Sequence, residues 1–152
     1  MPLKHVLFLC IGNSCRSQMA EGFARTYGSD VIAASSAGLA PAGIVSPLTR
    51  QIMLEKNIDL GDVLPKPLDP EMLQASGLII NMSGWKCPAP EGVAVEDWKV
   101  RDPIGQSEEV FRQVANEIEH LVMRLILRLR AEPAGEPTLP AGFDRTRRRF
   151  RQ

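Results

Sequence analysis

The residues best suited to chemistry lie near the N-terminus, in the run Cys10-Ile11-Gly12-Asn13-Ser14-Cys15-Arg16. A cysteine attacks as the thiolate, and a positive charge beside it favours that form. The guanidinium of Arg16 is a planar fork that matches two oxygens of a tetrahedral anion. Five intervening residues let the chain curl, so that both groups face one anion. The spacing therefore predicts that Cys10 is a nucleophile and that residues 11–16 bind an oxyanion.

This run lies between a predicted strand and a predicted helix. Residues 4–9 form an apolar segment rich in strand formers, and apolar residues recur at helical spacing from Met19 to Tyr27, before Gly28. A loop that leads from a strand into a helix places its N–H groups at the positive end of the helix dipole. The run has neither the Gly-Lys-Ser/Thr ending of a Walker loop nor a Gly-x-Gly-x-x-Gly pattern. We therefore expect an oxyanion-binding loop of another kind.

Strand and helix patterns alternate along the rest of the chain. Further strands are predicted at residues 31–36, 78–82 and 93–95, and further helices at 46–57, 69–77 and 107–129. Such alternation predicts an α/β fold, with a parallel sheet covered on both faces. From residue 131 the chain is rich in Pro, Gly and Arg without an apolar period. We predict a catalytic domain at residues 1–130 and a disordered tail at 131–152.

Composition narrows the function classes. With 152 residues and 44% hydrophobic content, the chain is large enough for one domain. Its 18 basic and 18 acidic residues cancel, so it lacks the basic field that nucleic-acid binding requires, and no apolar stretch reaches the roughly 18 residues of a membrane span. Cys10, Cys15 and Cys87 match neither a zinc site nor a disulfide framework. We expect a cytoplasmic enzyme with free thiols and no metal, cofactor, nucleic-acid partner or membrane partner.

The string Leu9-Cys10-Ile11-Gly12-Asn13-Ser14-Cys15-Arg16-Ser17 resembles the active-site loop of the low-molecular-weight protein tyrosine phosphatase superfamily. That superfamily also contains the thioredoxin- and mycothiol-coupled arsenate reductases. The likeness continues through Ser36-Ala37-Gly38 and Asp97-Trp98-Lys99-Val100-Arg101-Asp102-Pro103, and it covers residues 4–130. It implies a flavodoxin-like three-layer sandwich with a four-stranded parallel sheet.

The resemblance also implies roles for single residues. Cys10 would be the nucleophile, Arg16 would bind the oxyanion, and Asn13 would hold the loop in a strained shape. Ser17 would stabilise the thiolate. Asp102 would act as the general acid that protonates the leaving oxygen and later activates water. The resemblance calls for no metal or organic cofactor.

Two branches of this superfamily share the first chemical step and differ in the second. A phosphatase hydrolyses the phosphocysteine with water, whereas a reductase passes a disulfide along two further cysteines after the third strand. That segment offers Cys87 alone, with Met82 or a neighbour in place of the first relay cysteine. Cys15 could substitute by pairing with Cys10. Since every group that hydrolysis needs is present, we rank hydrolysis of a phosphorylated protein or small phosphate ester first.

The alternative is arsenate reduction, with an external thiol or a shortened cysteine relay as the reductant. Gln18 favours it, because the phosphatases usually have proline at this position. A third interpretation is an oxyanion-binding regulatory module without turnover. The intact set of Cys10, Arg16 and Asp102 argues against that one.

Overall fold

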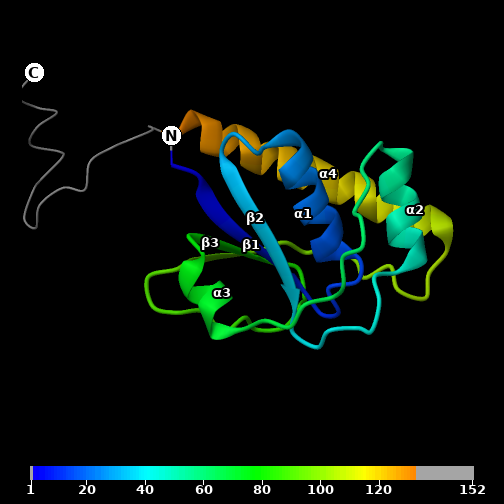
Figure 1. Ribbon diagram of the computed structural model, residues 1–152, viewed down its shortest axis with the longest axis horizontal. Coiled ribbons are helices and arrows are strands. Elements are labelled where there is room, and N and C mark those ends of the chain that lie inside the picture. Colours follow the sequence, from blue (N-terminus) through cyan, green and yellow to red (C-terminus); the bar gives the residue numbers. More distant parts are fainter. Residues whose placement is uncertain (1, 133–152) are drawn as a thin grey trace, which may run out of the picture.

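The structure is a computed structural model that describes residues 2–132 (Figure 1). Its strands are β1 (Lys4–Cys10), β2 (Ile32–Gly38), β3 (Leu78–Asn81) and β4 (Ala94–Asp97). Its helices are α1 (Arg16–Tyr27), α2 (Pro47–Glu55), α3 (Pro70–Ala75) and α4 (Glu108–Ala131). The disordered tail predicted at residues 131–152 lies outside the described residues from residue 133 onward.

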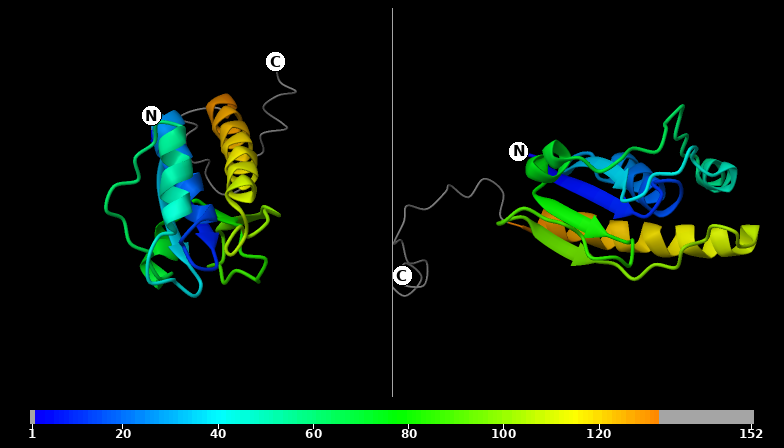
Figure 2. Two further views of the ribbon diagram at one scale, coloured as in Figure 1. Left: turned by 90° about the vertical axis from the view of Figure 1, so that its right-hand side faces the viewer. Right: turned by 90° about the horizontal axis from the view of Figure 1, so that it is seen from below.

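The strands form one parallel sheet in the order β2-β1-β3-β4. Side chains alternate along β1, so that Val6, Phe8 and Cys10 join the core under α1, α2 and α4. Leu7 and Leu9 join a smaller core on the opposite face, under α3. Figure 2 shows the sheet between these helix layers. The predicted α/β fold, a three-layer sandwich with four parallel strands, is confirmed.

Element boundaries differ from the predicted ones by up to three residues. Strand β2 continues to Gly38, because it pairs with β1 in register from Lys4–Ile32 to Cys10–Gly38. Helix α2 ends at Glu55 and α3 at Ala75, both earlier than predicted. The longest helix begins as predicted after Ser107, whose side chain accepts the N–H of Val110.

Gly28 ends α1 for a reason other than the one its position suggests. Its φ of −133° is not left-handed, so the backbone there does not require glycine. A Cβ atom at this position would instead lie 2.6 Å from Cγ1 of Ile126. Glycine is needed because the end of α1 packs closely against α4.

Candidate active site

The loop between β1 and α1 directs its carbonyl groups toward a neighbouring segment. The carbonyls of Cys10, Ile11 and Gly12 accept N–H groups from residues 39–42 at 3.1, 2.8 and 2.9 Å. Five N–H groups of this loop form no hydrogen bond with any described residue: those of Ile11, Gly12, Ser14, Cys15 and Arg16. Unpaired N–H groups at a helix N-terminus suit an anion. The loop therefore has the donors that an oxyanion needs.

Gly38 allows this loop to lie against the end of β2. A Cβ atom on Gly38 would lie 2.7 Å from the carbonyl oxygen of Ile11 and 2.9 Å from the backbone nitrogen of Asn13. Any larger residue would push the loop away from the sheet. This close contact explains why glycine occupies the last position of the Ser36-Ala37-Gly38 string.

Asn13 fixes the shape of the loop. It is fully buried and has a left-handed backbone with φ of 51°, a conformation that asparagine tolerates better than most residues. Its Nδ2 atom donates to Oγ of Ser17 at 2.7 Å and to Oγ of Ser36 at 3.0 Å. Its Oδ1 atom accepts from Nε2 of Gln18 at 3.0 Å and from the N–H of Lys66 at 2.9 Å. Four hydrogen bonds therefore hold the one strained residue of the loop.

Two donors meet at the sulfur of Cys10. The N–H of Asn13 donates to Sγ at 3.2 Å, and Oγ of Ser17 lies 2.9 Å from Sγ. Because Oγ of Ser17 already accepts a hydrogen from Asn13, its own hydrogen is free to point at the sulfur. Hydrogen bonds of this kind stabilise a thiolate. The surroundings of Cys10 thus suit a nucleophile.

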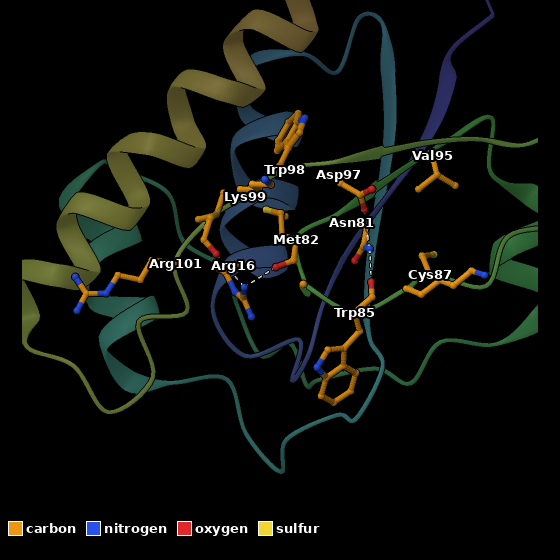
Figure 3. Close-up of a pocket in the computed structure, with 13 residues that line it drawn as sticks. Arg16, Asn81, Met82, Trp85, Cys87, Val95, Asp97, Trp98, Lys99 and Arg101 are labelled. Carbon is orange, nitrogen blue, oxygen red and sulfur yellow. Dashed lines mark hydrogen bonds between the residues drawn. The ribbon is translucent and has the colours of Figure 1, made fainter.

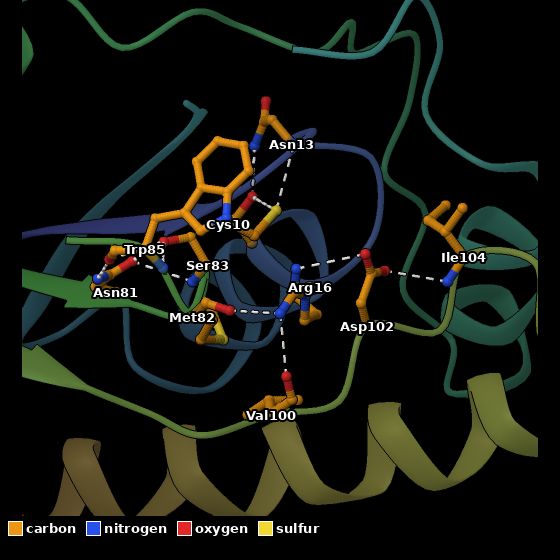
Figure 4. Close-up of polar contacts among 11 residues, drawn as sticks. Cys10, Asn13, Arg16, Asn81, Met82, Ser83, Trp85, Val100, Asp102 and Ile104 are labelled. Carbon is orange, nitrogen blue, oxygen red and sulfur yellow. Dashed lines mark hydrogen bonds and ion pairs between the residues drawn. The ribbon is translucent and has the colours of Figure 1, made fainter. Parts of the chain in front are cut away.

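Arg16 is buried and held from two sides (Figure 4). Its Nη1 atom donates to the carbonyl of Met82 at 2.5 Å and to the carbonyl of Val100 at 3.0 Å. Its Nη2 atom lies 3.7 Å from Oδ2 of Asp102. The side chain of Asp102 is 45% exposed, and it accepts the N–H of Ile104 at 3.1 Å. The structure thus places Asp102 beside the guanidinium of Arg16.

Cys15 differs from Cys10 although both belong to the same loop. Burial, with a smaller contribution from the negative charge of Cys10, raises the pKa of the Cys15 thiol to about 11. Cys15 is therefore a neutral thiol at physiological pH. A disulfide between Cys10 and Cys15 stays a prediction.

Cys87 lies in the segment that follows β3. It is half-buried and packs with the core on the α3 face of the sheet, whereas Cys10 belongs to the core on the other face. Burial and the nearby charge of Asp97 raise the pKa of the Cys87 thiol. The two thiols therefore pack into different cores.

The sequence analysis missed a buried carboxylate behind the loop. Oγ of Ser36 donates to Oε1 of Glu21 at 2.5 Å, and Oε2 of Glu21 pairs with Arg25 at 2.6 Å. Glu21 therefore orients the serine that accepts from Asn13. The sequence feature that could have indicated this buried carboxylate is an acidic residue between the apolar positions Ala20 and Phe23 of α1.

No three metal-ligating side chains cluster among residues 2–132, and no helix there is long and apolar enough to cross a membrane.

The family model described as low molecular weight phosphotyrosine protein phosphatase matches residues 5–89. The chain belongs to this family. It is 39% identical over 131 residues to the glutaredoxin arsenate reductase of Synechocystis sp., which covers 84% of this chain and 99% of the relative. A solved arsenate reductase in the phosphate binding state has a TM-score of 0.75 at 37% identity, over 84% of this chain and 99% of that one. This member of the family is therefore an enzyme.

Relatives named as phosphatases are more distant. A tyrosine phosphatase of Erwinia amylovora has a TM-score of 0.75 at 23% identity, over 84% of this chain and 94% of that one, and it shows the shared fold alone. The relatives at 37% and 39% identity carry the name arsenate reductase. The comparisons therefore favour the arsenate reductase alternative over the hydrolysis that the sequence analysis ranked first.

Proposed function

We propose that this protein is an arsenate reductase, in which Cys10 attacks arsenate bound by the loop of residues 11–16. The observation that carries the proposal is the pair of donors at the Cys10 sulfur, inside a loop with five unpaired N–H groups. Such a loop binds a tetrahedral oxyanion in general, arsenate as well as phosphate. The similarity to arsenate reductases at 37–39% identity supports the choice of arsenate.

The reaction follows from these groups. The thiolate of Cys10 attacks arsenic, and one arsenate oxygen leaves as water after protonation, which forms a sulfur–arsenic(V) bond. Asp102 suits the proton transfer, because its carboxyl group is half-exposed beside Arg16. A thiol then attacks Sγ of Cys10, and the electron pair of the sulfur–arsenic bond stays on arsenic, which leaves as arsenite. A second thiol reduces the mixed disulfide, so two thiols become one disulfide for each arsenate.

We infer that the attacking thiol comes from outside the chain, and not from Cys87. The turn of residues 81–85, which precedes Cys87 in the chain, is closed by its own hydrogen bonds. Nδ2 of Asn81 donates to the carbonyl of Trp85 at 2.7 Å and to Oδ1 of Asp97 at 3.0 Å. The N–H of Trp85 donates to Oγ of Ser83 at 3.0 Å. These bonds hold the turn that leads to Cys87.

The test is a reaction of the purified protein with arsenate and an excess of a small thiol. We expect arsenite to form, with two thiols oxidised for each arsenite, and we expect Cys10→Ser to abolish it. Absence of arsenite with every thiol tried, together with rapid hydrolysis of p-nitrophenyl phosphate, would refute the proposal.

A second candidate is hydrolysis of phosphate monoesters, which the position of Asp102 next to Arg16 favours. If Asp102 is its general acid, Asp102→Asn slows hydrolysis most for aryl phosphates with basic leaving groups. Equal slowing across the leaving-group series would count against this role. For either activity we propose a cytoplasmic location, because the three free cysteines of the described chain suit a reducing compartment.

A further inference from the structure

A cavity of about 800 Å³ lies beside the oxyanion loop (Figure 3). Arg16 lines it together with residues 81–82, 84–87, 95 and 97–101, which lie at and beyond the carboxyl ends of β3 and β4. Ligands of open α/β sheets bind outside the carboxyl ends of the strands, and this volume lies within the range of about 300–1,000 Å³ for small-molecule sites. Cys10 does not line the cavity, whereas Arg16 belongs to both the cavity and the oxyanion loop, so the two sites adjoin at Arg16.

The charges in the cavity favour an anionic ligand. Lys86, Lys99 and Arg101 line it in addition to Arg16. Neither Lys86 nor Lys99 pairs with a carboxylate of residues 2–132. The acidic side chain in the lining, Asp97, accepts a hydrogen bond from Asn81. The excess positive charge therefore remains available to a ligand.

The cavity also has an apolar surface. Trp85 is 51% exposed and Val95 is 38% exposed, although both are large hydrophobic residues. Trp98 lines the cavity and packs against Phe8 in the core, with 6.1 Å between ring centroids. Figure 3 shows Arg16 between the two tryptophans in that view. Exposed aromatic rings can stack on the body of a small organic ligand.

We propose that this cavity binds the thiol co-substrate, and that it selects small thiols with two or more carboxylates. The inference rests on the proposed arsenate reduction and adds the class of reductant. Carboxylates of the thiol pair with Lys86 and Lys99, and its sulfur extends past Arg16 to Sγ of Cys10. The basic lining also offsets the repulsion between an anionic thiol and the anionic arsenic adduct. The thiol attacks Sγ of Cys10, the sulfur–arsenic bond breaks, and arsenite leaves with the electron pair of that bond.

Tryptophan fluorescence tests binding without turnover, because both tryptophans of the chain line the cavity. The probe is S-methylglutathione, which has two carboxylates and no free thiol. It is titrated with saturating phosphate present, so that the oxyanion loop is already filled. We expect a saturable signal, and a Kd that rises about tenfold in Lys86→Gln/Lys99→Gln through the loss of two ion pairs.

The matched control is Lys4→Gln/Arg124→Gln, which removes two positive charges from exposed positions outside the cavity lining. It should leave the Kd unchanged. Lys86 and Lys99 are also exposed, so neither double variant should disturb folding. No saturable signal, equal effects of both double variants, or equal binding of the diethyl ester, which lacks both carboxylates, would overturn the cavity proposal.

Steady-state kinetics separate this proposal from the proposed function. With glutathione as reductant, Lys86→Gln/Lys99→Gln should raise KM about tenfold and leave kcat unchanged, whereas KM for uncharged 2-mercaptoethanol should not change. Arsenate reduction with an unchanged KM for glutathione would overturn the cavity proposal alone. Binding of the probe as expected, without any arsenite formed, would support the anion site and reject arsenate reduction.

Discussion

The loop after β1 and the segment after β3 leave neighbouring strands at the same edge of the sheet, yet they satisfy their backbones in opposite ways. In the first, the carbonyls are paired and five N–H groups stay free. In the second, the N–H groups of Ser83 and Trp85 donate to side chains, to Oδ1 of Asn81 and to Oγ of Ser83, each at 3.0 Å. The first is a receptor for an anion, whereas the second is closed on itself.

This difference corresponds to the two steps of the proposed arsenate reduction. The first step needs donors that are in place before arsenate arrives, and the loop of residues 10–17 provides them at no cost of reorganisation. The second step needs a thiol that reaches Cys10. Cys87 packs with the core on the other face of the sheet, and we therefore propose that this thiol comes from solution.

The largest effect is expected for Cys10→Ser. A serine hydroxyl stays protonated in surroundings that stabilise a thiolate, so arsenite formation should fall by about 10⁴-fold or more. Phosphate binding should persist, because the free N–H groups of the loop and Arg16 are unchanged. Arsenite production and calorimetric phosphate binding on the same sample check both parts. Retention of a tenth of the activity would show that another residue attacks.

Arg16→Lys should reduce turnover by about 10²- to 10³-fold, comparable to the loss of one oxyanion donor. The guanidinium donates to the carbonyls of Met82 and Val100 and still presents Nη2 toward Asp102, and an ammonium group cannot span these positions. Comparison of kcat/KM for the variant and the wild type measures the loss. A change below fivefold would mean that charge alone is sufficient.

The next prediction concerns the pKa of the Cys15 thiol, the second thiol of the loop. The folded protein raises the Cys15 pKa from 9.0 to about 11, so the unfolded chain loses this proton first as the pH rises. The stabilisation is complete below pH 9 and is lost between pH 9 and 11, with an upper limit of about 3 kcal/mol. Urea unfolding should show a steeper loss for wild type than for Cys15→Ala. Parallel pH profiles would refute the raised pKa.

The position of the loop between a strand and a helix could be predicted from sequence because its determinants are local. The string from Cys10 to Ser17 contains the proposed nucleophile, the guanidinium and Asn13, and a strand and a helix flank it directly. The supports of Arg16 escaped prediction, because they are backbone carbonyls of Met82 and Val100, 66 and 84 residues away. Backbone atoms have no residue type to recognise, and the pairing of β3 with β1 and of β4 with β3 brings them close.

The same limit applies to Cys87. Its sequence position matches the second relay cysteine, but its face of the sheet depends on how the chain turns after Asn81. Ser83 and Trp85 close that turn through side-chain hydrogen bonds. A sequence motif reports the presence of a thiol and not the side of the sheet on which it packs.

The smallest effect is expected for Cys87→Ser, and it decides most directly between an external thiol and an internal relay. Cys87 packs on the α3 face, and burial and Asp97 raise its pKa, so little thiolate is present to attack Cys10. We therefore expect less than about a twofold change in arsenite formation with a small thiol, since Cys87 takes no part in the exchange. Peptide mapping after arsenate treatment without added thiol should find no disulfide that contains Cys87. A tenfold loss of activity, or a disulfide between Cys10 and Cys87, would mean that the Asn81–Trp85 turn opens during catalysis, and the two regions would then act as one relay.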